Sequence, residues 1–401
     1  MPSARESHRS ILCGVLSDRD DVVFGSFTLE RWRGLVGAAR KEGVLPLLRH
    51  SFSHAGWPES MPRAIRQQLD RGALAAIAAN NIYYRELARI LAAMGGSGKT
   101  EVAVIKGAAL ALTLYSDPGL RPMGDLDLLL RPEDMAHGLS NLRELGYRPM
   151  FPEIAPGWNE NVGHAVTLRG GPHDRVLVDV HSRLVAGSAD WRSPSLAWLW
   201  DQMEPWNPPS PLAGAYGLSP TAQLLYLAAH LVLQHGEAEA RLIWYYDLHL
   251  LAKEPKRVDW DVLLRRAHEL RWAAAVRVAL EGCRRQLGTP LPDGLVEELD
   301  RRSDAGARRF VARMMDPAQT RATQLWNQAR CLPWTARLRL LTRHVFPSPA
   351  YVRWRYRLWS PWLWPLGYPY RWLTIASEGF STLAKRTLRA AGRRDRQVIS
   401  R

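Results

Sequence analysis

The hydrophobic and polar positions divide the chain into two helical regions and a central segment with a strand-like pattern. Between residues 27 and 91, apolar residues recur at helical spacing, with breaks at Gly43, at residues 56–58 and at residues 61–62. A helical pattern returns at Ser219, where Ser followed by Pro is a normal helix start. The sequence therefore predicts helices on both sides of a central unit.

The central unit alternates strand and helix patterns. The apolar run Val102–Ile105 ends at Lys106 and Gly107, passes into helix-like sequence and returns as a second apolar run that ends at Leu130. Such an order of strand, helix and strand is typical of an α/β unit.

Two further patterns complete the central unit. Residues 132–145 form an amphipathic helix pattern that ends at Gly146. The runs 164–168 and 176–180, joined across residues 170–172, predict a hairpin. We therefore predict an α+β fold in which a small mixed sheet is flanked by N-terminal and C-terminal helical regions.

Composition shifts suggest the boundaries of four parts, one of them at the Pro-rich stretch 205–211. We predict a helical lead-in (1–95), an α/β core (96–205), a C-terminal helical region (206–345) and an aromatic, basic tail (346–401).

The segment MGGSGKT at residues 94–100 resembles a phosphate-binding loop, but Ala93 stands where that motif needs its first glycine. A helix pattern precedes the segment and a strand pattern follows it, which is the reverse of the order that the motif requires. We interpret the segment as a turn and assign no nucleotide contact to Lys99.

The composition is that of a globular protein, with 401 residues, 46% hydrophobic and 23% charged. Its three cysteines are far apart and show no Cys-x-x-Cys spacing, so we expect neither a zinc site nor a disulfide framework. The N-terminal residues contain no apolar stretch of the kind that a secretory signal needs. We expect a cytoplasmic protein.

The net charge of +15 is concentrated at the C-terminus, where residues 351–401 hold eleven Lys or Arg and two acids. Residues 351–372 also contain five Trp and four Tyr, and residues 373–391 form a basic amphipathic pattern. This composition suits the inner surface of an anionic membrane. Two alternatives stay open: a contact with nucleic acid or a protein partner, which we favour less, and a packing strap with a basic end.

The candidate chemistry lies on the second apolar run. Because side chains alternate along a strand, Asp125 and Asp127 project to one side and the neighbouring leucines to the other. Two carboxylates held so close repel each other, and a divalent cation between them relieves the repulsion. Oxygen ligands of this kind suit Mg²⁺ or Mn²⁺.

A third carboxylate, Asp179, shares one strand face with His181 in the run VLVDVH. If this strand lies beside the first, three acids converge on a site for two metal ions. The alternative is that Asp-x-Asp belongs to a turn or a calcium loop, in which the motif is also common.

These motifs, in this order, resemble the uncharacterised nucleotidyltransferases of the DNA polymerase beta-like superfamily. The resemblance covers roughly residues 30–290. The residues that carry it are Lys106-Gly107 opening a helix, Arg121 ahead of Asp125-Leu126-Asp127-Leu128-Leu129, Gly146-Tyr147 ending the next helix, and Asp179-Val180-His181.

The resemblance implies an enzyme that moves a nucleoside monophosphate from a nucleoside triphosphate, such as ATP, to a hydroxyl group of an acceptor and releases pyrophosphate. It implies that Asp125 and Asp127 bind both metal ions, and that Asp179 binds the catalytic ion and helps to deprotonate the acceptor. Alternative functions are a non-catalytic adaptor, docked to a membrane or a biosynthetic complex through the tail, and the end modification of tRNA or DNA.

The resemblance also assigns the substrate contacts. The wider superfamily has Ser after the glycine, with its hydroxyl on the phosphates, whereas this chain has Ala108. Lys106, Gly107 and the backbone amides at that helix start would therefore face the triphosphate. Arg121 would neutralise phosphate charge or hold its loop through an ion pair with Asp125.

Four further residues are candidates for binding. His181 would orient Asp179, touch the acceptor or simply pack. His230 and His235 are five residues apart, which places them on different sides of an α-helix, so we expect no joint site. Asp247 would pair with Arg241 or reach the acceptor, and we favour a structural role.

Overall fold

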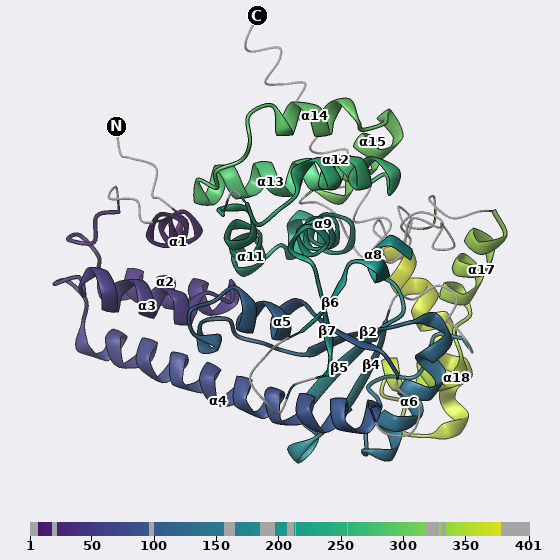
Figure 1. Cartoon of the computed structure of the whole chain (residues 1–401). Helices are drawn as coiled ribbons and strands as arrows, with labels where there is room; N and C mark the ends of the chain where they lie inside the picture. Colours follow the sequence, from purple (N-terminus) through teal and green to yellow (C-terminus); the bar gives the residue numbers. More distant parts are fainter. Residues whose placement is uncertain are drawn as a thin grey trace, which may run out of the picture.

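The computed structural model describes residues 7–17, 22–95, 100–155, 165–184, 197–206, 212, 214–254, 256–316, 329 and 334–377. Figure 1 shows a central sheet with the long helix α4 (Arg63–Met94) along one face and a group of C-terminal helices over the other. Helical regions therefore flank a mixed sheet at both ends of the chain, as the sequence predicts.

The N-terminal helices begin and end close to the predicted breaks. Helix α2 (Leu29–Lys41) stops before Gly43, whose φ is 75°, and α3 (Leu45–Ala55) stops at Gly56, whose φ is 102°. Backbone of this hand strains any residue that carries a Cβ, which explains the glycines. A further helix, α1 (His8–Leu16), begins at the capping residue Ser7 and was not predicted.

The sheet has seven strands in the order β3-β4-β5-β2-β1-β7-β6. Its three central strands β5, β2 and β1 carry the predicted motifs: β1 pairs with β2 antiparallel, and β2 pairs with β5 parallel. The strands are β1 (Val102–Ile105), β2 (Leu126–Leu130), β3 (Arg148–Pro149), β4 (Ala165–Gly170), β5 (Val176–His181), β6 (Met203–Pro205) and β7 (Tyr216–Leu218).

The connections between strands follow the predicted order. Helix α5 (Lys106–Thr113) begins directly at the end of β1, and α6 (Met135–Glu144) follows β2 after the short helix η2 (Pro132–Asp134). Strands β4 and β5 pair antiparallel, which confirms the hairpin. His164 lies outside the described residues, as do residues 96–99 of the MGGSGKT segment.

The C-terminal helical region begins where predicted, because α9 (Pro220–His230) starts after Ser219 with Pro220 at its first position. At its end the helix continues as one π-helical turn, η5 (Leu231–His235). The remaining helices are α8 (Ala197–Asp201), α10 (Gly236–Glu239), α11 (Leu242–Ala252), α12 (Trp260–Glu269), α13 (Ala273–Leu287), α14 (Leu295–Arg301) and α15 (Ala305–Met314).

The two faces of the sheet bury different sets of side chains. Leu126, Leu128 and Leu130 of β2 pack in a cluster with residues of α4 and α6. Leu129 and its neighbours on β1 pack instead in a larger cluster with α9, α11 and α13, and the N-terminal helices α1 to α3 join that cluster. Since Asp127 alternates with Leu126 and Leu128, its side chain lies on the face toward the C-terminal helices.

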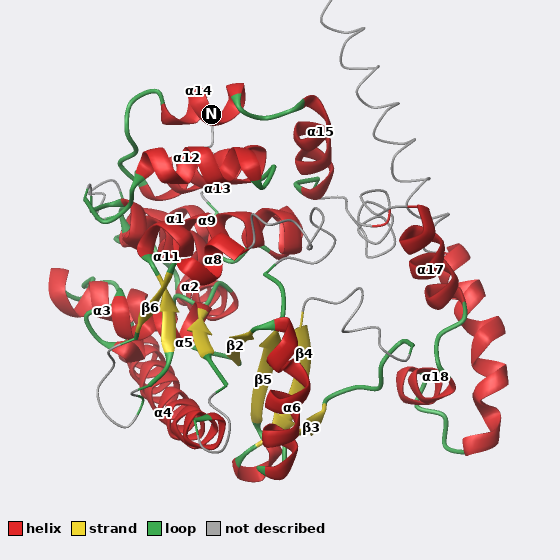
Figure 2. Ribbon diagram, turned by 45° about the vertical axis from the view of Figure 1, so that its right-hand side comes forward, coloured by secondary structure: helices red, strands yellow, loops and turns green. Residues whose placement is uncertain are grey.

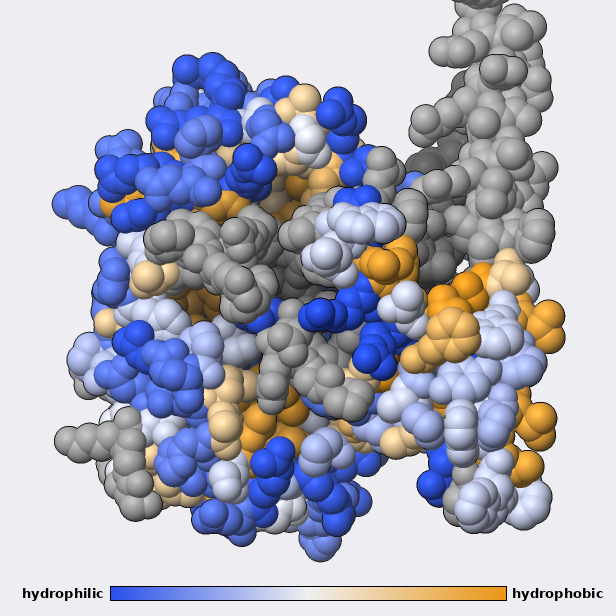
Figure 3. Space-filling view, turned by 90° about the vertical axis from the view of Figure 1, so that its right-hand side faces the viewer, coloured by the Kyte–Doolittle hydropathy of each residue, from blue (hydrophilic) through white to orange (hydrophobic). Residues whose placement is uncertain are grey.

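Residues 334–377 form a separate layer at the β3 side of the sheet, visible at the right of Figure 2. This C-terminal arm contains α17 (Trp334–Val345), α18 (Pro349–Arg355), the short helix η6 (Pro361–Leu363) and a helical stretch at residues 364–377. The predicted basic helix begins inside it, and residues 378–391 lie outside the described part. None of the helices that the structure describes is long and apolar enough to cross a bilayer. Figure 3 shows this side of the molecule.

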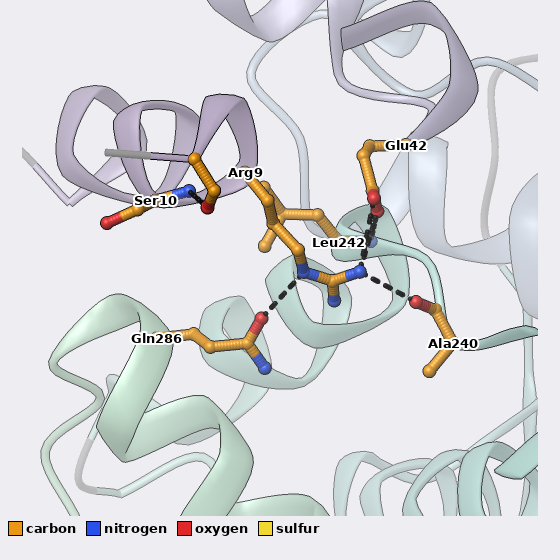
Figure 4. Close-up of polar contacts among 7 residues, drawn as sticks. Arg9, Ser10, Glu42, Ala240, Leu242 and Gln286 are labelled. Atoms are coloured by element: carbon orange, nitrogen blue, oxygen red, sulfur yellow. Dashed lines mark hydrogen bonds and ion pairs between the residues drawn. The ribbon is translucent and has the colours of Figure 1, made fainter. Parts of the chain in front are cut away.

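Arg9 of α1 joins the N-terminal helices to the C-terminal region (Figure 4). Its guanidinium donates to Glu42 at 3.1 Å, to the Ala240 carbonyl at 3.0 Å and to Gln286 of α13 at 3.1 Å. Glu42 in turn accepts from the Leu242 amide at 2.7 Å. The helices that precede the sheet and those that follow it are thereby held together beside the carboxylate face.

Candidate functional site

Strands β2 and β5 bring the predicted acids together. In their parallel register Asp127 lies opposite Asp179, and Leu129 lies opposite His181. Residues paired in this way point to the same side of the sheet. One ligand atom each from Asp127, Asp179 and His181 lies within 4.8 Å of the others, so the predicted meeting of Asp127 and Asp179 is confirmed.

Asp127 is the most enclosed acid of the group, with 4% of its surface exposed. Its Oδ1 accepts a hydrogen bond from Lys106 Nζ at 2.8 Å and lies 2.8 Å from His181 Nε2. The carboxylate therefore connects the start of α5 with the end of β5.

Asp179 has one oxygen that the surrounding protein leaves unused. Thr167, its partner on β4, hydrogen-bonds to the carboxylate, but Oδ1 is buried and has no hydrogen-bond partner among the described residues. A buried oxygen without a partner costs free energy unless a cation or water satisfies it. Together with Asp127 and His181, Asp179 makes a donor set of two carboxylates and an imidazole that suits a divalent metal ion.

The charges of the site reinforce this picture. Burial raises the pKa of Asp125 to about 6, with repulsion from Asp127 as the next cause. The pKa of Asp179 is raised for the same two reasons. Burial, followed by the charge of Lys106, lowers the pKa of His181 to about 3, so its imidazole is neutral and able to bind a metal.

These side chains open into a pocket of about 380 Å³, a size typical of small-molecule sites. Asp125, Asp127 and Asp179 line the pocket together with residues of η5 and α11. Asp125 lines the pocket but is not one of the three residues of the 4.8 Å cluster, whereas His181 is. Lys106, Gly107 and Arg121, all predicted to contact substrate, also line the pocket.

Lys106 is the first residue of α5 and has a strained backbone conformation. Its φ of 54° is uncommon for a residue with a side chain, and such strain tends to occur at functional sites. Burial is the largest single influence and opposes its charge, but the attractions of Asp127, Tyr226 and Asp125 together outweigh burial and raise the pKa of Lys106. Ala108, in contrast, is 1% exposed and packs in the cluster on the α4 side of the sheet.

Arg121 has a different partner from the predicted Asp125. Its Nε and Nη2 donate to both oxygens of Asp247 on α11, the shortest contact being 2.8 Å, and Tyr115 donates to the same carboxylate at 2.6 Å. Asp247 therefore pairs with Arg121 and not with Arg241. The ion pair is buried and joins the loop before β2 to the C-terminal helices.

The same loop is also held from helix α4 by a residue that the sequence analysis missed. The Asn80 amide donates to the carbonyls of Pro118 at 2.8 Å and Arg121 at 3.0 Å, and its oxygen accepts from the Met123 amide at 3.2 Å. Asn80 is 2% exposed. A polar residue inside the amphipathic pattern of this helix was the available signal.

The expectation that His230 and His235 lie on different sides of a helix was wrong. Their rings lie 4.7 Å apart at 66°, and the His235 ring lies 4.4 Å from Trp244 of α11. The separation of five residues puts side chains on different sides of an α-helix, but the π-helical turn η5 repeats after about that number of residues. Both histidines line the same pocket as the acids.

His181 lies behind the acids. It is fully buried, bonds to Asp127 and is not among the lining residues of the pocket. A direct contact with an acceptor therefore finds no support in this geometry, and metal binding or orientation of Asp127 does.

One family of known proteins matches this chain. The family model described as uncharacterised nucleotidyltransferase matches residues 28–288, which include α2 to α13 and every residue of the pocket. The chain belongs to this family. Searches of curated proteins and of solved structures find no match.

Membership of the nucleotidyltransferase family makes the chain a transferase of phosphorus-containing groups. The family implies a nucleoside triphosphate as substrate, and nucleotidyltransferases generally use divalent metal ions. The cluster of Asp127, Asp179 and His181 fits that requirement.

Proposed function

We propose that the pocket transfers a nucleoside monophosphate from a nucleoside triphosphate to a hydroxyl group of an acceptor. The observation that carries the proposal is the in-register pairing of Asp127 with Asp179, which places two carboxylates and His181 within 4.8 Å of one another beside Lys106. Acids held together at an open pocket with a nearby cationic side chain suit the binding of a metal and a phosphate.

In this proposal Asp127 and Asp179 hold Mg²⁺ or Mn²⁺, with Asp125 at the pocket edge and His181 behind them. The ion, when bound, would neutralise charge on the phosphates and favour ionisation of the attacking hydroxyl. The unused Oδ1 of Asp179 supports this assignment, because it is buried and belongs to a carboxylate of the cluster.

Side chains and backbone amides of this chain bind the phosphates and accept the proton. Lys106 and the amides at the start of α5 bind phosphate oxygens, in place of the serine hydroxyl that this chain lacks. Arg121, held by Asp247, keeps its positive charge at the pocket wall. Asp179 accepts the proton of the acceptor hydroxyl, whose oxygen forms a bond to the α-phosphorus. The bond from that phosphorus to the bridging oxygen breaks, and pyrophosphate leaves.

The aromatic and polar lining of the pocket is the place for the organic parts of the substrates. His230, His235 and Trp244 offer ring faces, and Gln234 and Arg241 offer polar hydrogens. Rings of this kind suit stacking with a base or a sugar.

The test measures pyrophosphate release by the purified full chain with each nucleoside triphosphate, Mg²⁺ and fractionated extract as the source of acceptor. We expect Asp127→Asn to reduce release by about a hundredfold or more, because the metal contributes several kcal/mol to transition-state stabilisation. The far-ultraviolet circular dichroism of the variant should match that of the parent.

The matched control is Asp261→Asn, an exposed acid at the start of α12, which should leave release unchanged. Equal release by the parent and Asp127→Asn would contradict the proposal. The absence of any triphosphate binding, in calorimetry with Mg²⁺, would favour the adaptor alternative.

A further inference from the structure

The exposed hydrophobic residues of this protein are concentrated in one place. Of the eighteen large hydrophobic side chains that are exposed among the described residues, twelve belong to the C-terminal arm. They are Trp334, Leu338, Val345, Phe346, Trp354, Trp359, Trp362, Leu366, Tyr370, Trp372, Leu373 and Ile375. In Figure 3 hydrophobic residues gather over the part of the surface that the arm forms. A patch of this extent indicates an interaction surface.

The last helical stretch of the arm, residues 364–377, exposes apolar side chains and buries its charged one, the reverse of a usual surface helix. Trp362, Leu366, Tyr370 and Leu373 follow one another at helical spacing. Each of these four side chains is at least 58% exposed. The one charged residue of this stretch, Arg371, is 8% exposed and donates to the His344 carbonyl at 2.7 Å. The outward face is therefore apolar and uncharged.

The charge of the arm has a single sign. Residues 334–377 contain seven arginines and no acid. Arg353, Arg355 and Arg357 are exposed and flank the exposed ring of Trp354. An apolar surface with a border of arginines is complementary to a layer that combines hydrocarbon with negative charge.

The arm is fixed to the rest of the protein. Ser348 donates from its hydroxyl to the Glu153 carbonyl at 2.7 Å and from its amide to the Ile154 carbonyl at 2.6 Å. The rings of Trp354 and Phe151 lie 5.6 Å apart. The apolar face is thus held in a set orientation beside the sheet, away from the pocket residues.

We propose that the C-terminal arm docks the enzyme on the surface of an anionic lipid bilayer. Trp and Tyr side chains would lie at the level of the head groups, the leucines and Ile375 would enter the acyl boundary, and the arginines would bind lipid phosphates. Single-stranded nucleic acid would also attract arginines and aromatic rings. Binding to nucleic acid does not require exposed aliphatic side chains, whereas insertion into a bilayer does. The exposed leucines and Ile375 therefore favour the bilayer. The inference does not depend on the proposed chemistry of the pocket.

The test is flotation of the full chain with vesicles of phosphatidylcholine alone and of phosphatidylcholine mixed with phosphatidylglycerol. We expect binding to the mixed vesicles that weakens with salt. The double variant Trp362→Ser/Leu373→Ser should bind at least about tenfold more weakly, because apolar area is lost. The triple variant Arg353→Gln/Arg355→Gln/Arg357→Gln should lose about a hundredfold on mixed vesicles.

The matched control is Leu74→Ser/Ile82→Ser, which removes two exposed hydrophobic residues of α4 outside the arm and should float like the parent. Failure of the parent to float with mixed vesicles would overturn the proposal, as would equal losses in the control and the arm variants. Salt-sensitive binding to single-stranded RNA without flotation would assign the arm to nucleic acid instead. Pyrophosphate release in solution should be the same for all these variants.

Discussion

Among single residues, Lys106 combines a left-handed backbone, an enclosed side chain and an ion pair with the central carboxylate. Its Nζ lies 2.8 Å from Asp127 Oδ1, and both side chains are largely removed from solvent. A buried charge that loses its partner is destabilising by several kcal/mol. Lys106 therefore supplies the positive charge that Asp127 needs when no other cation is bound.

We predict that Lys106→Met lowers the free energy of unfolding by about 3 kcal/mol in a buffer with a chelator. The side chain of methionine is as long as the four-carbon stem of lysine, and both residues are strained to the same degree at a φ of 54°. The substitution therefore removes the charge and leaves the rest nearly unchanged. Added Mg²⁺ should recover more stability in this variant than in the parent, because the ion replaces the lost charge.

The measurement is thermal unfolding with and without Mg²⁺, and Lys253→Met, at an exposed lysine after α11, is the control. An unchanged transition for Lys106→Met in chelator would contradict the role given to the Lys106–Asp127 ion pair.

At this scale the sequence predicts which strand face carries an acid, because the alternation of side chains is strict. It cannot predict partners that tertiary structure supplies. Arg121 and Asp247 are 126 positions apart, and no local pattern relates them. The contact of His181 with Asp127 likewise depends on the register of two strands, which only the folded sheet determines.

At the scale of elements, the loop between α5 and β2 is held from two sides. Helix α4 contributes Asn80 and the Tyr83 hydroxyl, which donates to the Gly124 carbonyl at 2.6 Å. Helix α11 contributes Asp247 through its pair with Arg121. Because Asp125 directly follows this loop, these contacts position the start of β2.

We predict that Asn80→Ala lowers the free energy of unfolding by about 3 kcal/mol, because it leaves two carbonyls and an amide, all buried or partly buried, without their partner. Nucleotidyl transfer should fall as well, since Asp125 and Asp127, at the start of β2, lose their support. Urea unfolding and pyrophosphate release measure the two effects.

The neighbouring Asn81 offers the control, because its side chain is exposed. Asn81→Ala should change the free energy of unfolding by no more than about 0.5 kcal/mol. Equal effects of the two substitutions would show that the loop is held in another way.

Predicted elements of this chain were most accurate where Gly and Pro mark their ends, as at Gly43, Gly56 and Pro62. The π-helical turn η5 was not predictable from apolar spacing, because apolar periodicity alone assumes the α-helical repeat. Its consequence is functional, since it turns His230 and His235 toward each other at the pocket.

At the scale of the whole molecule, the helices before the sheet and the helices after it share one hydrophobic cluster. Helices α1 to α3 pack in it with α9, α11, α12 and α13, on the same side of the sheet as Asp127. The boundaries proposed at residues 95, 205 and 345 stay a prediction, because sequence patterns show where elements change but not which elements share a core.

We predict that Arg9→Met lowers the free energy of unfolding by about 2 kcal/mol, since its charge-assisted bonds to Glu42, Ala240 and Gln286 are only partly exposed. Urea unfolding of the full chain is the measurement. The comparison is Arg49→Met, whose pair with Asp70 is more exposed and should contribute less than about 1 kcal/mol. A smaller loss for Arg9 than for Arg49 would mean that the two helical regions pack without this contact.

The account as a whole depends on Asp127 and Asp179 holding one divalent ion between neighbouring strands. The most direct measurement is the binding of Mn²⁺ to the full chain, followed by electron paramagnetic resonance, with and without a non-hydrolysable triphosphate. We predict one strong site that Asp127→Asn or Asp179→Asn weakens at least about tenfold, while Asp261→Asn leaves it unchanged. No strong site under either condition, or equal Mn²⁺ binding by all three variants and the parent, would contradict the account.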